Sequence, residues 1–186
     1  MTSAVNLSLA DAVLTGARVI RVETTGPRPA PRLTVEFSAE VMYPGLRLAP
    51  EFPWNWRLDG ATTLVLDVTN PTDHAVPVGL RVDDGQIPEG NFVAASANVP
   101  PGAHRVMLRL QGLAPDDPYA LPAPSRELPV RLGSVVLHPR VGTEFDLSHV
   151  TAVTVYLAHP AATTTLVLGG LTRVAEQAAP RFAFGR

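Results

Sequence analysis

Alternation of apolar and polar residues runs through the chain and is clearest between residues 64 and 84. Residues 64–68 are mostly apolar, residues 70–73 are turn formers, and residues 76–82 carry an apolar side chain at every second position. This pattern predicts a β-hairpin with one buried face. The opposite face of the returning strand would carry small or charged residues, namely Pro77, Gly79, Arg81 and Asp83.

The same alternation predicts about ten short strands separated by proline and glycine. Beyond the hairpin, strands are expected at residues 17–23, 33–37, 43–48, 92–99, 106–110, 130–137, 153–157 and 163–174. Residues 1–15 are expected to hold one strand, and Asp146 to cap one helical turn over residues 146–150. Loops are expected at residues 26–31, 85–91 and 112–129. Because no amphipathic helix of useful length interrupts these strands, the chain is predicted to be all-β, an antiparallel β-sandwich or barrel.

Composition narrows the classes of partner. The 186 residues are enough for one domain with a substantial core, and 46% of them are hydrophobic while 17% are charged. A net charge of -2 gives no reason to expect nucleic acid or an anionic membrane as partner. The absence of cysteine excludes disulfides, thiol nucleophiles and zinc–thiolate sites. The N-terminus lacks the basic and apolar regions of a signal peptide, and no apolar stretch reaches the roughly 20 residues of a membrane helix.

An ordered set of segments carries a resemblance to a known family. The segments are residues 54–56 (WNW), 64–71 (LVLDVTNP), 80–84 (LRVDD), 146–153 (DLSHVTAV) and 165–168 (TLVL). Together they resemble the N-terminal carbohydrate-binding-module-like domain of glycoside hydrolase family 50 β-agarases, over most of residues 31–186. The resemblance implies a jelly-roll, galactose-binding-like sandwich over residues 1–174 and a linker over residues 175–186. It further implies a secreted or periplasmic protein. In the family a catalytic barrel follows this domain, so the 186 residues are expected to be either an excised module or a stand-alone relative.

One departure from the family pattern bears on metal binding. Gly169 and Gly170 stand where related modules carry Asp-Asn, whose acidic residue often helps hold a structural calcium. The chain therefore lacks a ligand that such a calcium would use. No cofactor is expected, although a structural calcium stays open.

Two tryptophans and a set of charged residues are the binding candidates. Trp54 and Trp56 lie on one face if their segment is extended, and would either stack on sugar rings or plug the end of the core. The polar positions of the strands carry Glu36, Asp67, Arg81, Asp83, Arg105 and Arg109. These residues would either line a sugar-binding groove or form ion pairs on a solvated sheet face. Asn91, near Asp83 and Asp84, is a further hydrogen-bonding candidate, and that acidic pair is read as a turn rather than a calcium site.

Enzymatic motifs are missing from the sequence. The histidines occur singly, and no HExxH motif, nucleophile elbow, Walker loop or dinucleotide fingerprint is present. We therefore expect a non-catalytic module, accessory to a glycoside hydrolase, that binds agarose-type or related plant or algal polysaccharide or oligosaccharide. The predicted contacts are stacking by Trp54 or Trp56 and hydrogen bonds from Arg81, Asp83, Asn91 and Arg105. The alternative is a structural β-sandwich that packs on a catalytic domain or on its own copies.

Overall fold

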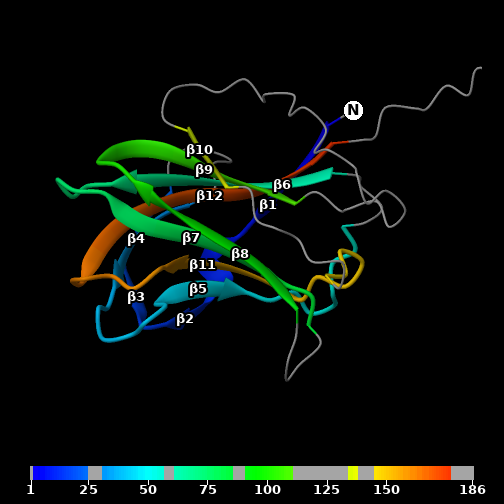
Figure 1. Cartoon of the computed structure of the whole chain (residues 1–186), viewed down its shortest axis with the longest axis horizontal. Helices are drawn as coiled ribbons and strands as arrows, with labels where there is room; N and C mark the ends of the chain where they lie inside the picture. Colours follow the sequence, from blue (N-terminus) through cyan, green and yellow to red (C-terminus); the bar gives the residue numbers. More distant parts are fainter. Residues whose placement is uncertain are drawn as a thin grey trace, which may run out of the picture.

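The protein folds as two packed β-sheets. The computed structural model describes residues 2–24, 31–56, 61–85, 91–110, 134–137 and 145–176. Within these ranges it has twelve strands and one short 3-10 helix, η1 (Leu9–Asp11). The predicted all-β jelly-roll sandwich is therefore confirmed (Figure 1). The one helix in the described ranges is far too short and too polar to cross a membrane.

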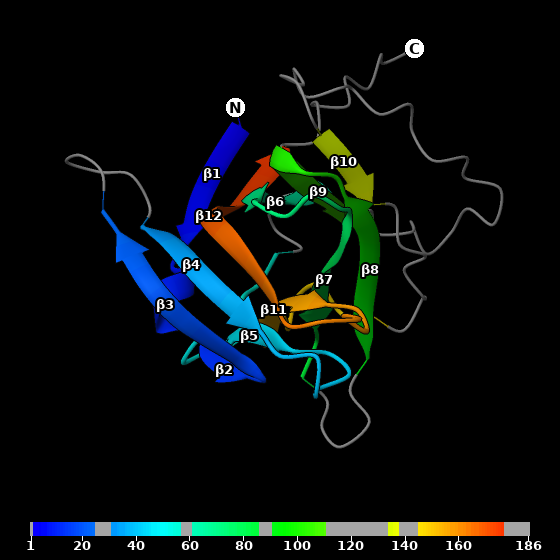
Figure 2. The ribbon, with the colours of Figure 1, turned by 90° about the vertical axis from the view of Figure 1, so that its left-hand side faces the viewer.

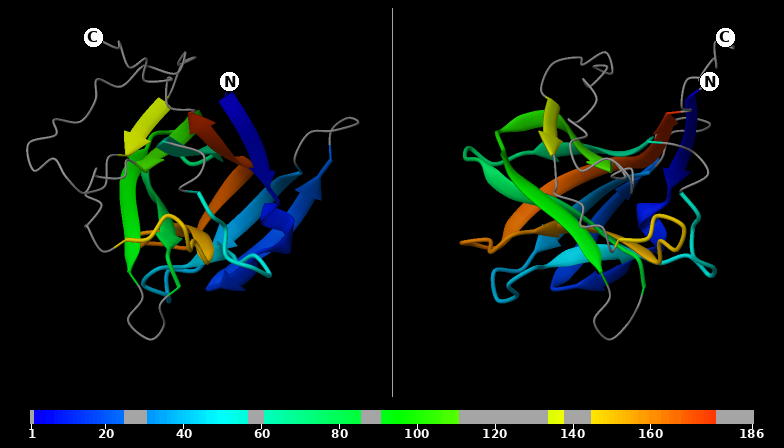
Figure 3. Two further views of the ribbon diagram at one scale, coloured as in Figure 1. Left: turned by 90° about the vertical axis from the view of Figure 1, so that its right-hand side faces the viewer. Right: turned by 45° about the vertical axis from the view of Figure 1, so that its right-hand side comes forward.

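The larger sheet, sheet A, has seven strands. Its order is β10 (Ser134–Leu137), β9 (Gly102–Leu110), β6 (Ala61–Asn70), β12 (Thr164–Glu176), β4 (Arg32–Phe37) and β3 (Ala17–Glu23), with β1 (Thr2–Leu7) also paired to β12. The pairs are antiparallel apart from β10 with β9, which is parallel. β1 runs beside the end of β12, so the two ends of the described chain share one edge of the fold (Figure 3).

The smaller sheet, sheet B, has five antiparallel strands. Its order is β2 (Val13–Thr15), β5 (Gly45–Leu48), β11 (Ala152–Leu157), β7 (Val76–Asp83) and β8 (Phe92–Val99). Viewed along the layers, sheet A covers the top and left of the core and sheet B the bottom and right (Figure 2). The inward alternate positions of both sheets, such as Leu33, Val35 and Phe37 of β4, are fully buried between them. Burying one face of each strand is what the period-2 pattern encodes.

The predicted hairpin over residues 64–84 is wrong. Both of its strands exist, but β6 pairs with β9 and β12 in sheet A, whereas β7 pairs with β8 and β11 in sheet B. The turn between them therefore crosses from one layer to the other. Alternation specifies which face of a strand is buried but not which strand lies beside it, and a crossing turn leaves the same pattern as a hairpin.

Asn70 supports this crossing from a buried position. Its amide nitrogen donates to the carbonyl oxygens of His74 (2.8 Å) and Val99 (3.0 Å), and its amide oxygen accepts from the Thr72 backbone N–H (3.0 Å). The side chain thereby satisfies backbone groups of the turn and of the buried end of β8.

Gly169 and Gly170 mark an irregularity in β12. The register between β12 and β6 shifts between Leu168 and Leu171, which is the position of the two glycines. A Cβ added at Gly169 would lie 2.9 Å from the Cβ of Asp67, so the strands approach too closely for a larger residue. β12 pairs with β4 before this point and with β1 after it, and it extends through Glu176.

Several predicted segments fall beyond the described ranges. These are the proline-rich loop at residues 26–31 apart from Pro31, most of residues 85–91, the long loop at residues 112–129, and residues 177–186 of the predicted linker. The expected helical turn at residues 146–150 is a single hydrogen-bonded turn, in which the His149 N–H donates to the Asp146 carbonyl (3.0 Å). Asp146 does stabilise it, because its carboxylate accepts from the Ser148 N–H (2.8 Å).

Candidate functional site

The two tryptophans stack on each other at one end of the sandwich. Their segment is extended: Trp54 and Val150 exchange backbone hydrogen bonds of 2.8 and 3.0 Å, and the Trp56 N–H donates to the Leu147 carbonyl (2.8 Å). The ring centroids lie 5.7 Å apart with planes only 16° from parallel, as expected for neighbours on one face of an extended segment. Trp56 is 2% exposed and belongs to the core, and Trp54 is partly buried against that core. Trp56 thus has the core role that the sequence left as the alternative to sugar stacking.

Asp84 joins two loops beside this end. Its side chain is buried, one carboxylate oxygen accepts from the Asp146 backbone N–H (3.1 Å), and its own N–H donates to the Asn91 carbonyl (3.1 Å). Within the described ranges, no group of three or more histidine, aspartate or glutamate side chains is arranged to hold a metal ion. The β12 bulge does not fit calcium either, because Asp67 beside it is paired with Arg105 and the glycines supply no carboxylate.

The polar face of sheet A carries cross-strand ion pairs. Asp67 and Arg105 are opposite each other on β6 and β9, and their side chains form an ion pair of 2.9 Å. Arg18 and Glu36 do the same across β3 and β4, also at 2.9 Å. Arg105 therefore forms a cross-strand ion pair on a solvated face. It also lies on the sheet opposite to Arg81 and Asp83, so these three candidates do not meet in one groove.

Sheet B presents a different outer face, centred on Tyr156. Tyr156, Gly79 and Ser96 occupy one row across β11, β7 and β8. A Cβ built on Gly79 would lie 2.3 Å from Cζ of Tyr156 and 2.6 and 2.7 Å from its ε carbons. The outer half of the ring therefore lies directly over Gly79, which can only be glycine if the ring is to rest on the strand. Burial raises the pKa of the Tyr156 hydroxyl above its usual value, and a hydrogen bond with the Ser96 side chain opposes that rise.

A second tyrosine stands beside this ring. Tyr43 is 51% exposed, and its centroid lies 6.0 Å from that of Tyr156 with the planes 78° apart. Tyr43 is held by His159, whose Nε2 forms a 2.9 Å hydrogen bond with the tyrosine hydroxyl and whose ring packs edge-on against it at 4.7 Å. His159 has a left-handed φ of 49°, and its N–H donates to the Met42 carbonyl (2.9 Å). The Tyr156 ring thus lies on the sheet, and the Tyr43 ring stands beside it at nearly a right angle.

Arginines lie on both sides of the Tyr156 strand. Arg47 on β5 and Arg81 on β7 are both opposite Thr154, two residues from Tyr156 on β11. The Arg81 Nε donates to the Asp83 carboxylate (2.7 Å), and its guanidinium carbon lies 4.0 Å from the centre of the Phe92 ring. Arg81 is therefore fixed in place while its remaining N–H groups are available to a ligand.

The predicted site residues thus occupy three places. Trp54 and Trp56 lie at the end of the sandwich, Arg81 and Asp83 lie on the outer face of sheet B with Asn91 just before β8, and Arg105 lies on sheet A. Sequence reasoning missed Tyr156, Tyr43, Phe92 and Arg47. A signal for Tyr156 was present, since it occupies an outward position in the alternation of residues 153–157 where a polar residue is the usual choice.

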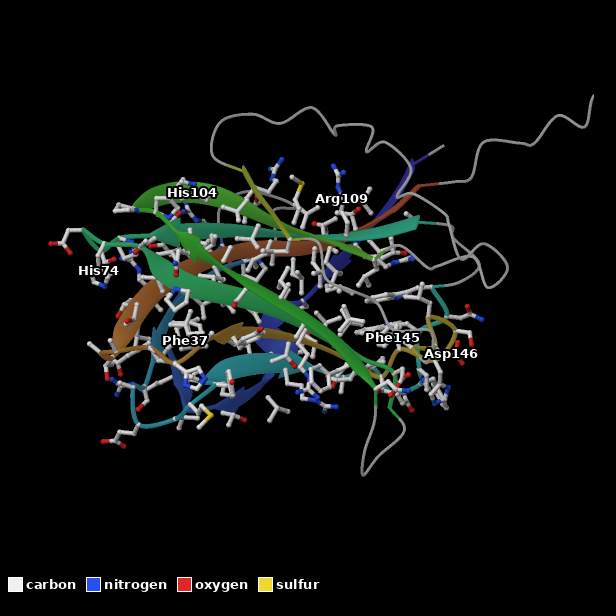
Figure 4. All side chains as sticks on the ribbon, in the orientation of Figure 1. Phe37, His74, His104, Arg109, Phe145 and Asp146 are labelled. Atoms are coloured by element: carbon white, nitrogen blue, oxygen red, sulfur yellow. The ribbon has the colours of Figure 1, made fainter. Side chains whose placement is uncertain are left out.

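The histidines within the described ranges are dispersed, as their spacing in the sequence indicates. Figure 4 shows His74 and His104 at one end of the sandwich and Phe145 and Asp146 at the other, with Phe37 between the layers. His74 contacts the Asp73 carboxylate at 2.9 Å, and His104 contacts the Pro101 carbonyl at 3.1 Å. These are local turn contacts and bring no two histidines together.

Solved structures show what the fold is similar to. An exo-β-agarase matches 94% of this chain with a TM-score of 0.64 and 19% identity, and a second agarase matches 91% with a TM-score of 0.65 and 18% identity. The chain has the jelly-roll fold seen in family 50 agarases. It spans about a quarter of their length, since the match covers 24% of either agarase chain.

A shorter protein matches over nearly its whole length. It is a family 11 carbohydrate-binding module from Clostridium thermocellum, solved in complex with a β-1,3-1,4-mixed-linked tetrasaccharide. The match covers 96% of this chain and 91% of that module, with a TM-score of 0.52 and 10% identity. No family model matches the chain. No curated protein matches it either.

Proposed function

We propose that this protein is a non-catalytic carbohydrate-binding module that holds a polysaccharide or oligosaccharide on the outer face of sheet B. The observation that carries the proposal is the Tyr156 ring lying flat over Gly79, with Tyr43 standing beside it. A pyranose ring has an apolar face of C–H groups and a rim of hydroxyls. A flat aromatic ring packs against the C–H face at little entropic cost, and nearby planar donors form hydrogen bonds with the hydroxyls.

The polar groups around Tyr156 suit the sugar rim. Arg81 is fixed by Asp83 and Phe92, Ser96 and Asn98 lie at outward positions of β8, and Thr154 precedes Tyr156 on β11. These side chains offer donors and acceptors on both sides of the ring. A ligand extended across the strands would contact several of them at once, which is how a chain of sugars gains affinity from weak single contacts.

The outer face of sheet B is poorly suited to glycoside hydrolysis. Among the outward positions of its described strands, Asp83 is the one carboxylate, and Arg81 neutralises it. Glycosidases of the usual kind need two carboxyl groups on either side of the scissile bond. The proposed role is therefore binding, accessory to a glycoside hydrolase. The similarity to the agarases supports an agarose-type or related galactan as the ligand.

Affinity electrophoresis tests the proposal. Agarose, β-glucan, xylan, mannan and pectin would each be cast into native gels, and the migration of the wild type compared with that of Tyr156→Ala and Trp54→Ala. We expect at least one polymer to retard the wild type, Tyr156→Ala to lose most of that retardation, and Trp54→Ala to keep it. If Trp54→Ala loses binding while Tyr156→Ala keeps it, the site lies at the end of the sandwich instead. If a broad panel of polymers and oligosaccharides leaves the wild type unretarded, the binding role is excluded.

A second function is favoured by apolar side chains on the edge strands, where Val13 of β2 is opposite Arg47 on sheet B and Val22 of β3 lies on sheet A. Apolar side chains are exposed at the N-terminal edge, where Val13 of β2 is 66% exposed and Val22 of β3 is 57% exposed. Such an edge suits packing on a catalytic domain or on a second copy of the chain. Light scattering after size exclusion separates the two functions. A wild-type dimer that becomes a monomer in Val22→Glu, together with no sugar binding by the wild type, would favour the structural role.

A further inference from the structure

The outer face of sheet B holds few charged side chains. The outward positions of the described strands of sheet B hold Arg47, Arg81 and Asp83, which gives a net charge of +1. Since Arg81 is paired with Asp83, the excess positive charge is that of Arg47.

Arg47 is exposed and lies next to the proposed sugar platform. It is directly opposite Thr154, so it is a diagonal neighbour of Tyr156, at about 7–8 Å between Cα atoms. A guanidinium reaches that far across a strand. Its flanking neighbour on β2 is Val13, which offers it no carboxylate, and within the described ranges Arg47 forms no ion pair. Arg47 is therefore exposed on the same face of sheet B as the Tyr156 ring.

From this placement we infer that the glycan bound on sheet B carries anionic substituents, sulfate esters or carboxylates, and that Arg47 is the residue that recognises them. The inference rests on the proposed function and names the class of sugar within it. An arginine fork matches the two oxygens of a sulfate or carboxylate, whereas a neutral hydroxyl uses only one of its donors. The second arginine, Arg81, is paired with the carboxylate of Asp83 and would donate its remaining hydrogen bonds to neutral sugar hydroxyls.

Matched polymers test the inference. Titration calorimetry would compare a sulfated galactan with the same polymer after desulfation, and a polyuronate with its methyl ester. The wild type should bind at least one acidic form about tenfold more tightly than its neutral partner, which is the gain expected from one charge-assisted hydrogen-bonded pair. The pair that shows the difference tells whether sulfate or carboxylate is recognised. The difference should shrink in high salt.

Arg47→Gln and Arg105→Gln each remove one positive charge, so comparing them separates a local contact from an effect of net charge. Arg47→Gln should remove most of the tenfold preference and leave the affinity for the neutral polymer within about twofold, since it removes only the charge-assisted contact. Arg105→Gln makes the same change in net charge on sheet A and should leave the preference intact. Arg47→Lys, which keeps the charge but loses the fork, should retain part of it.

Each result has a definite meaning. Equal affinity for the acidic and neutral forms overturns the inference while leaving the sugar-binding proposal standing. An equal loss in Arg105→Gln and Arg47→Gln also overturns it, because the preference would then follow net charge. Absence of binding to every polymer removes the proposed function and the inference with it.

Discussion

Replacing Gly79 with alanine should displace the Tyr156 ring from the outer face of sheet B. The new methyl carbon would lie 2.3 Å from Cζ of the ring, whereas ordinary contacts begin at 3.4 Å, so the ring must retreat by about 1.1 Å or rotate away. The strand beneath cannot easily yield, because β7 is paired on both sides. Overpacking of this kind costs about 1–3 kcal/mol of unfolding free energy.

The same substitution should be harmless once the ring is gone. Gly79 is not among the glycines with positive φ, so alanine can adopt its backbone conformation. In a Tyr156→Ala background, Gly79→Ala should then be neutral or stabilise the strand by up to about 1 kcal/mol. The two substitutions should therefore show a coupling free energy of at least about 1 kcal/mol in a double-mutant cycle.

Urea unfolding followed by tryptophan fluorescence measures all four corners of the cycle, because Trp56 is buried in the folded state. Gly79→Ala should also weaken sugar binding about fivefold or more, as the loss of one stacked ring does elsewhere. A Gly79→Ala cost that is the same with and without Tyr156 would refute the reasoning, since it would show that the ring does not rest on Gly79.

Three further predictions follow from the contacts described above. Trp56→Ala should cost about 3–5 kcal/mol of unfolding free energy and Trp54→Ala clearly less, because only Trp56 is fully buried; equal costs in urea unfolding would contradict this. Asn70→Asp should destabilise the fold more than Asn70→Ala, because a carboxylate would face two carbonyl oxygens in a buried position; thermal unfolding of both variants measures the order, and the reverse order would be evidence against the buried network. Because the folded pKa of Tyr156 is raised, its contribution to stability is complete below the unfolded value of about 10 and is lost as pH rises through the folded pKa. Tyr156→Phe should therefore flatten the fall of the melting temperature above pH 10, and an unchanged pH profile would count against the burial of that hydroxyl.

The sequence by itself determined the strands and their buried faces. The period-2 alternation identified β4 and β7 closely, and both bury their apolar sets as expected. It also gave the bounds of β8, although Phe92 there is exposed, and the second half of β9. It also assigned Arg81 and Asp83 to an outward face and put the two tryptophan rings on one side of their segment. These features are local, because each follows from the backbone geometry of a few consecutive residues.

Only the tertiary structure decided which strands are neighbours. Apolar strands of similar composition compete for the same partners, so the turn at Asn70 could have closed a hairpin but instead crosses between the sheets. The proposed platform depends on that outcome, since Tyr156 comes from a strand far along the chain from those of Gly79 and Ser96. A ring from one strand can rest on a glycine of another only after the pairing places them in one row, and pairing across such distances is a property of the whole fold.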